Sequence, residues 1–97
     1  MAELHLDEVK SIGRAAARSL AGDDLEMVDA VARPDGSDEV SYFITYRLTR
    51  DRDREAIHKL FLGISHRVRD TLIERGDEHY PYIDLLGPAP TLLPLGV

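Results

Sequence analysis

The segment TRDRDREAIHKLF, residues 49 to 61, holds the densest run of side chains that could do chemistry. Arginine forks and the free N–H groups of a helix start can bind a phosphate or a carboxylate, and paired aspartates can contribute to a metal site. Alternating charges can also simply keep a helix start in water, which is the favoured interpretation. The anion or partner site is kept as a hypothesis, and its residues are Arg47, Arg50, Arg52, Arg54, Lys59 and Arg67.

Histidines and serines offer little sign of catalysis. His58 and His66 lie eight positions apart, so on a helix they do not converge on one ion. His79 follows Asp77 and Glu78 and is the remaining candidate for a general base. The chain has no Gly-x-Ser-x-Gly elbow, no Gly-x-Gly-x-x-Gly run and no P-loop. We therefore expect no catalytic residue, no metal ligands, no cofactor and no enzymatic activity.

Two groups of apolar side chains are candidates for an interface. Tyr42 and Tyr46 share one face of a predicted strand. They are either core residues with wet hydroxyl ends or, if no helix covers them, a platform for stacking bases or a dimer interface. Three leucines near the C-terminus are expected to pack on the domain or on a second copy, because a free apolar tail is unusual. These residues are Leu92, Leu93 and Leu95.

Helical spacing of apolar residues predicts two helices. The first spans about residues 6 to 20, with Asp7 as N-cap and Gly22 just beyond its end. The second carries apolar residues at positions 57, 60, 61, 64, 68 and 72 and is capped by Thr49, Asp51 or Asp53. Gly76 is expected to end it.

Three strands complete the predicted domain. Residues 25–33 and 40–49 form a hairpin around a Pro-Asp-Gly turn. The first of these strands is apolar on both faces, which predicts a strand that is covered on both sides or lies in mid-sheet. The second alternates well, except that Phe43 interrupts its polar face. The third follows the second helix, and Pro81 starts it or lies on an edge.

The resulting α-β-β-α-β order predicts an α+β two-layer sandwich, with both helices on one face of a small, mainly antiparallel sheet. A right-handed crossover would place the third strand parallel to the second if the two strands adjoin. The domain spans residues 1–87, and residues 88–97 form an extended, proline-rich apolar tail. Over about residues 7–86 this order resembles type II KH-like small domains, including the ribosome-binding-factor and BolA-like groups. Their Gly-x-x-Gly loop and Arg-His-Arg run are absent, so no functional residue is carried over.

Charge and composition narrow the partners. Twelve Lys and Arg against 18 Asp and Glu give a net charge of −6, which argues against a strong non-specific nucleic-acid binder and against DNA. Residues 47–75 alone carry +3, so RNA remains an alternative partner. Cysteine is absent, which fits a reducing cytosol. No signal peptide or membrane span is expected, and the preference for Arg over Lys suggests a bacterial source.

From these observations the sequence predicts a small, cytoplasmic, non-enzymatic protein-interaction module that forms a homodimer. The alternative is a KH-like RNA-binding domain that uses the arginines of the second helix. Fold alone does not decide between them.

Overall fold

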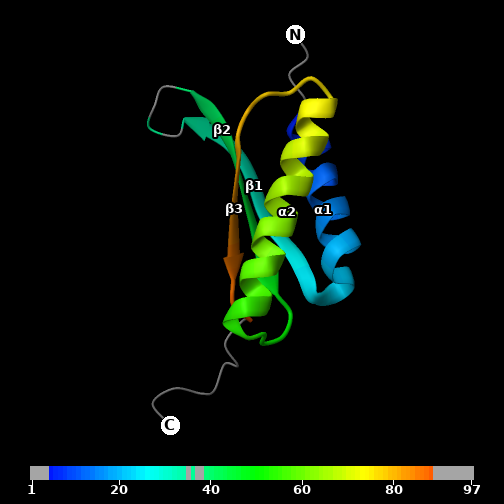
Figure 1. Ribbon diagram of the computed structural model, residues 1–97. Coiled ribbons are helices and arrows are strands. Elements are labelled where there is room, and N and C mark those ends of the chain that lie inside the picture. Colours follow the sequence, from blue (N-terminus) through cyan, green and yellow to red (C-terminus); the bar gives the residue numbers. More distant parts are fainter. Residues whose placement is uncertain (1–4, 35, 37–38, 89–97) are drawn as a thin grey trace.

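The computed structural model describes residues 5–34, 36 and 39–88. The elements follow the predicted order: α1 (Leu6–Ala21), η1 (Gly22–Asp24), β1 (Leu25–Pro34), β2 (Val40–Leu48), α2 (Arg54–Glu74) and β3 (Pro81–Leu86). Both helices lie on one face of the sheet (Figure 1). The predicted α+β two-layer architecture is therefore confirmed.

The sheet is mixed rather than mainly antiparallel. Within the described residues its strand order is β1-β2-β3, with β1 antiparallel and β3 parallel to β2. The two strands adjoin, and their parallel pairing confirms the predicted direction of the third strand. Because the order ends with β3, Pro81 both starts a strand and lies on an edge strand, where a missing N–H costs least.

The prediction of a mid-sheet position for β1 is wrong, because β1 is the other edge strand among those described. A β-bulge between Met27 and Asp29 explains the misleading pattern. The extra residue shifts the alternation, so Leu25, Met27 and Ala30 all pack toward the core despite their uneven spacing. Val28, the residue inside the bulge, is 49% exposed.

The core fills the space between the helices and the sheet. From α1 it takes Val9, Ile12, Ala16 and Ala17, from α2 Leu60, Ile64, Val68 and Leu72, and from the sheet chiefly Tyr42, Ile44, Tyr46, Leu48 and Ile83. Small residues on α1 let it approach the sheet closely. At Gly13 an added Cβ would lie 2.5 Å from Met27 Cε and 3.0 Å from Tyr46 Oη.

The helix ends follow capping rules, with one exception. Asp53 caps α2 and accepts a hydrogen bond from Ala56 N–H at 2.7 Å, as one of the predicted alternatives. For α1 the predicted cap is wrong: His5 is the N-cap, and Asp7 lies in the first turn, where a carboxylate suits the positive end of the helix dipole. Gly22 and Gly76 take the positive φ values expected after the helices, 59° and 82°.

Candidate functional site

The arginines before α2 bind a carboxylate of the chain itself. Arg50 Nε lies 3.2 Å from Asp24 Oδ1, and Arg52 Nη2 contacts Asp24 Oδ2. Hydrogen bonds from Arg50 and Arg52 hold the pKa of Asp24 below its usual value. Thr49 N–H also donates to the Asp24 carbonyl at 2.9 Å, which ties this connection to the start of β1. Asp24 thus occupies the position that the sequence hypothesis gave to a partner anion.

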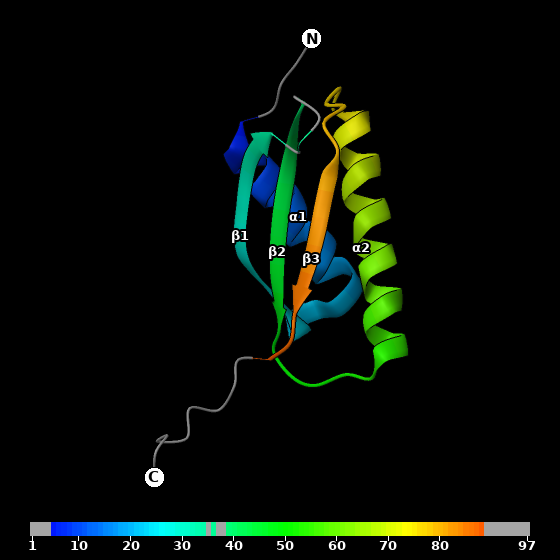
Figure 2. The same cartoon turned by 90° about the vertical axis from the view of Figure 1, so that its left-hand side faces the viewer.

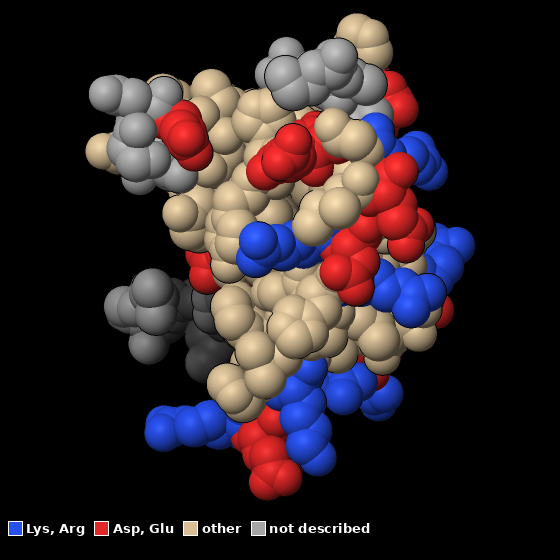
Figure 3. Space-filling model, turned by 45° about the horizontal axis from the view of Figure 1, so that its top comes forward, with Lys and Arg blue, Asp and Glu red and all other residues tan. Residues whose placement is uncertain are grey.

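The rest of the predicted basic set is not brought together. Arg47 belongs to β2, Arg54 begins α2, and Lys59 pairs with Glu55 one turn away at 3.8 Å. Arg67 is an exposed residue further along α2. Figure 3 shows basic and acidic side chains interspersed over the face in view, with no continuous basic surface there. RNA binding by these residues stays a prediction.

Tyr42 and Tyr46 are core residues, so the interface hypothesis fails for them. They are 3% and 0% exposed, because both helices cover their face of the sheet. Tyr46 Oη donates to the Gly13 carbonyl at 2.7 Å, and burial raises the pKa of Tyr46. Neither tyrosine can reach a partner or a base in this fold. Leu92, Leu93 and Leu95 lie outside the described residues.

A buried carboxylate, Asp77, receives the hydroxyl of Tyr42. Its side chain is fully buried in the turn after α2, where Tyr42 Oη donates to Oδ2 and His79 contacts Oδ1 through its backbone N–H at 2.9 Å and Nδ1 at 2.6 Å. Burial raises the pKa of Asp77, but the hydrogen bonds from Tyr42 and His79 outweigh burial and leave the pKa below its usual value. Because the carboxylate is enclosed, the contacts of Asp77 with Tyr42 and His79 join the start of β3 to the core. Among the described residues there is no group of three or more His, Cys, Asp or Glu side chains that could hold a metal ion.

The face of the sheet that points away from α1 and α2 is the surface that sequence reasoning missed. We call it the open face, because no described helix crosses it (Figure 2). The strand register places on it Glu26, Asp29, Val31, Arg33, Phe43, Thr45, Arg47, Tyr82, Asp84 and Leu86. The interruption of the polar face of β2 by Phe43 was the one signal of this surface in the sequence.

Three apolar residues form a row across the middle of the open face. Val31 pairs with Phe43, and Phe43 pairs with Tyr82, so the three side chains lie side by side on adjacent strands; we call them the central row. The rings of Phe43 and Tyr82 are stacked at 5.0 Å, and Tyr82 is 42% exposed. Arg33 lies over the Phe43 ring at 4.1 Å. The stacked rings and the overlying guanidinium hold these side chains against one another on the sheet surface.

A second aromatic contact extends this surface beyond β3. Tyr80 packs edge-on against Tyr82 at 4.8 Å, and Arg69 of α2 lies 5.1 Å from the Tyr80 ring centre. Tyr80 is 45% exposed. Tyr, Phe and Arg are the residue types enriched at protein interfaces.

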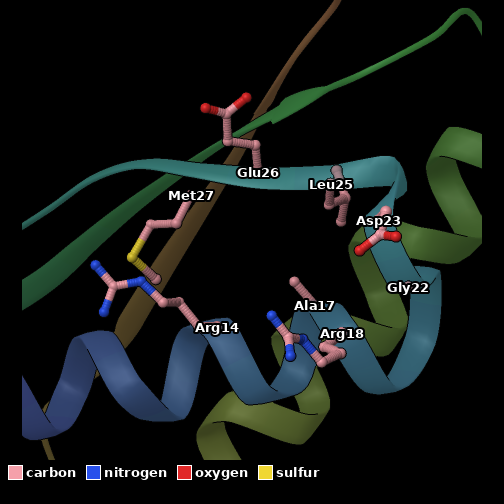
Figure 4. A pocket seen from close by; sticks show the side chains of 8 residues that line it. All are labelled: Arg14, Ala17, Arg18, Gly22, Asp23, Leu25, Glu26 and Met27. Carbon is pink, nitrogen blue, oxygen red and sulfur yellow. The ribbon is translucent and has the colours of Figure 1, made fainter.

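Two hollows lie beside the edge strands. The first, of about 260 Å³, opens between α1 and β1; Arg14 and Arg18 stand on its helix side, and Glu26 points away from it (Figure 4). The second, of about 310 Å³, lies between α2 and β3 and is lined by Arg54, Ile57, His58, Phe61, Ile83, Asp84 and Leu85. The second is the more apolar of the two, so it suits hydrophobic side chains rather than a small charged ligand.

No protein-family model and no curated protein matches the chain. Solved structures do show a likeness. A copper form of the MamM C-terminal domain aligns with a TM-score of 0.63 at 13% identity, covering 92% of this chain and 92% of that one. The chain is similar in fold to MamM C-terminal domains.

Two further MamM structures agree. A copper form of a single-substitution variant has a TM-score of 0.62 at 15% identity and covers 88% of this chain and 100% of that one. A cadmium form of another variant has a TM-score of 0.58 at 16% identity, with 90% and 100% covered. At these identities the likeness establishes the fold. None of the described helices has the length and apolar character needed to cross a bilayer.

Proposed function

We propose that this domain is a protein-interaction module that forms a homodimer through the open face of its sheet. The observation that carries the proposal is the central row of Val31, Phe43 and Tyr82, a stacked apolar strip left uncovered by the described elements. Soluble domains seldom leave such a strip exposed without a partner, and sheets commonly pack face to face over rows of this kind.

Charge complementarity supports a second copy as the partner. A two-fold axis that runs across the strands at the central row turns each strand end for end and sets it against the same strand of the partner copy. Arg33 and Asp29 lie two residues to either side of Val31, so each faces the other across the axis. Tyr80 and Asp84 likewise lie two residues to either side of Tyr82. Across the axis, the Tyr80 hydroxyl of one copy, with Arg69 nearby, therefore faces the Asp84 carboxylate of the other. The open face is thus complementary to itself.

The proposal assigns no catalysis to the domain. The Asp77–His79 pair, which most resembles an acid–base couple, encloses its carboxylate and uses it to accept hydrogen bonds from Tyr42 and His79. A buried carboxylate committed in this way serves the turn and the core rather than a substrate.

The test compares two exposed apolar residues of equal exposure. Tyr82 on the open face and Leu62 on α2 are each 42% exposed. Tyr82→Glu places a charge in the central row, and we expect it to convert the dimer into the 10.9 kDa monomer, as measured by light scattering or sedimentation across a concentration series. Leu62→Glu should leave the dimer intact. A wild-type chain that stays monomeric throughout, or equal effects of both substitutions, would overturn the proposal.

A further inference from the structure

Apolar side chains lie on both walls of the groove between α2 and β3. Ile57 and Phe61 belong to its helix wall, and Ile83 and Leu85 belong to its strand wall. Phe61 is 36% exposed. Figure 2 shows β3 at the border of the sheet with α2 beyond it, so the groove follows an edge strand of the described sheet. A groove between a helix and a strand edge suits an extended segment.

The ladder between β2 and β3 fixes the direction of the backbone groups beside this groove. Tyr42 N–H donates to the Tyr80 carbonyl, and Tyr42 pairs with Pro81. Backbone groups alternate in direction along a strand, so even-numbered residues of β3 face β2, and Ile83 and Leu85 direct their N–H and C=O groups to the other side. No described strand pairs with β3 on that side, so these groups are available to an added strand.

Charged side chains also line the groove, and their signs differ between its two walls. Arg54 and His58 lie one turn apart on α2, and Asp84 belongs to β3. The two arginines before Arg54 share Asp24, but Arg54 makes no ion pair with any residue that the structure describes. The helix wall therefore offers a guanidinium to the carboxylate of a partner, and the strand wall offers a carboxylate to a cation.

The charged and apolar side chains follow one another along the groove. Figures 1 and 2 show that α2 begins near the end of β3 and runs back along it. Arg54 is the first residue of α2 and Leu85 is the second-last of β3, so both lie at the same end of the groove. Phe61, about two turns further along α2, lies toward Ile83. A bound segment therefore meets a positive charge beside Leu85 and an aromatic ring beside Ile83.

We propose that this groove binds an extended segment of a partner protein, which adds to β3 as a further strand. Alternate side chains of the segment share the face of Ile83 and Leu85 and point into the groove. The side chain beside Ile83 is apolar and packs on Phe61. The side chain beside Leu85 is acidic and pairs with Arg54.

The residue between these two lies on the opposite face of the added strand. Its neighbour on β3 is Asp84, so it is basic, because opposite charges on neighbouring strands attract. The partner segment therefore carries an apolar, a basic and an acidic residue in succession, in one chain direction or the other.

The inference goes beyond the proposed dimer and does not depend on it. Dimerisation uses the open face, whereas Arg54 and Phe61 belong to a helix on the opposite face of the sheet. Molecular mass in solution reports on the dimer, and peptide binding reports on the groove, so the two proposals fail separately.

Selection from a phage-displayed library of random peptides tests the sequence pattern. With the immobilised full-length chain as the target, we expect the enriched peptides to contain an apolar, a basic and an acidic residue in succession, in either chain direction. Absence of enrichment, or enriched peptides without this order of residues, would overturn the proposal.

A matched pair of substitutions tests where the most enriched peptide binds. Phe61→Glu and Leu62→Glu each add one negative charge at an exposed apolar residue of α2, but only Phe61 lines the groove. Fluorescence anisotropy of the labelled synthetic peptide should show binding weakened by about tenfold or more in Phe61→Glu. Binding to Leu62→Glu should be close to that of wild type. Equal losses in the two variants would contradict docking in the groove.

Charge exchange tests the role of Arg54. Arg54→Glu should weaken binding of the selected peptide by about fivefold, because an exposed ion pair is lost. A second peptide, with lysine in place of the acidic residue, should bind Arg54→Glu more tightly than it binds wild type. If Arg54→Glu and wild type show the same preference between the two peptides, no carboxylate pairs with Arg54 and the proposal is wrong.

Hydrogen exchange tests the added strand itself. The amides of Ile83 and Leu85 face the free edge, and at saturating peptide we expect them to exchange more slowly by about tenfold or more. Those of Tyr82 and Asp84 already face β2 and serve as internal controls. Binding without slower exchange at Ile83 and Leu85 would rule out strand addition. Equally slow exchange of all four amides without peptide would show that the chain itself or a second copy already pairs with this edge, and that result would also rule out the proposal.

Discussion

At the scale of single residues, the contacts that the sequence could not predict are those between positions far apart in the chain. Tyr42 and Asp77 are 35 positions apart, and Arg52 and Asp24 are 28 apart. The sequence pattern predicted the local setting of three of these residues: Tyr42 on a strand, Asp77 in the turn after the second helix and Arg52 at the capped start of that helix. Nothing local indicates which carboxylate will meet which donor, because that depends on how α2 crosses the sheet.

The Tyr42 hydroxyl should stabilise the fold through Asp77. Tyr42→Phe removes one donor from a buried carboxylate, and we expect the free energy of unfolding at pH 7 to fall by about 1.5–3 kcal/mol. Denaturant titration measures the loss. Tyr82→Phe, which removes an exposed hydroxyl, is the matched control and should have little effect.

This contribution should also depend on pH. The folded pKa of Asp77 is lower than the value of about 3.9 in an unfolded chain, so the stabilisation is present above that value and is lost as pH falls through the folded pKa. The stability difference between wild type and Tyr42→Phe should therefore narrow in acid, below about pH 4. A difference that stays constant down to about pH 2 would show that Tyr42 acts through packing alone.

Two helical glycines should respond to alanine in opposite directions. At Gly13 the new methyl group would displace the flexible end of Met27 and would lie 3.0 Å from Tyr46 Oη, which is buried and held by its hydrogen bond to the Gly13 carbonyl. Because the Tyr46 hydroxyl cannot move freely, Gly13→Ala should lower the stability by about 1–3 kcal/mol despite better helix propensity. At Gly63 the nearest atom is Leu20 Cδ1 at 3.3 Å, on a side chain that is 42% exposed and free to shift. Gly63→Ala should therefore raise the stability by about 0.5–1 kcal/mol. Urea unfolding midpoints of the two variants test this prediction. Midpoints that both rise or both fall relative to wild type would contradict the packing described.

At the scale of elements, periodicity predicted α1, α2 and β2 well because each has one face in the core and one in water. For β1 the same logic failed, since the bulge at Val28 changes which residues face inward partway along the strand. A bulge depends on the partner strand, so a single sequence does not reveal it. The cap of α1 was missed for a related reason: Asp7 suits either the cap or the first turn, and only the entry angle of the chain decides.

The link between η1 and the start of α2 gives an element-scale prediction. Asp24→Asn keeps the shape of the side chain but removes the charge that Arg50 and Arg52 share. Phosphate should then shift the backbone amides of residues 50–56 in this variant, because the arginine forks and the helix start are available to another anion. In the wild-type chain the shifts should be much smaller. Asp23→Asn is the control, and equal phosphate responses in all three proteins would show that Asp24 does not compete for this site.

At the scale of the whole molecule, the order of elements was enough to predict the two layers and the parallel placement of β3. It did not predict which sheet face would carry the apolar surface, because that depends on which strands become neighbours. Val31, Phe43 and Tyr82 are far apart in the chain and become a continuous row only after pairing. The sequence interpretation gave the interface role to Tyr42 and Tyr46, which the helices cover, and the uncovered aromatic residues are on the opposite face.

Charge reversal can test the two-fold arrangement as a property of the pair of molecules. In the proposed dimer Arg33 of each copy faces Asp29 of the other. Arg33→Asp alone sets aspartate against aspartate twice, and Asp29→Arg alone sets arginine against arginine twice, so each variant should dimerise more weakly than wild type.

An equimolar mixture of the two variants restores two opposite-charge pairs. In one pair the introduced aspartate of the first variant meets the introduced arginine of the second, and in the other pair the native Asp29 and Arg33 meet. We expect native mass spectrometry to show mainly the mixed dimer at low salt, with the preference reduced as salt screens these exposed charges. Mixed and unmixed dimers in statistical proportion would contradict the axis at the central row, even if Tyr82→Glu still abolished association.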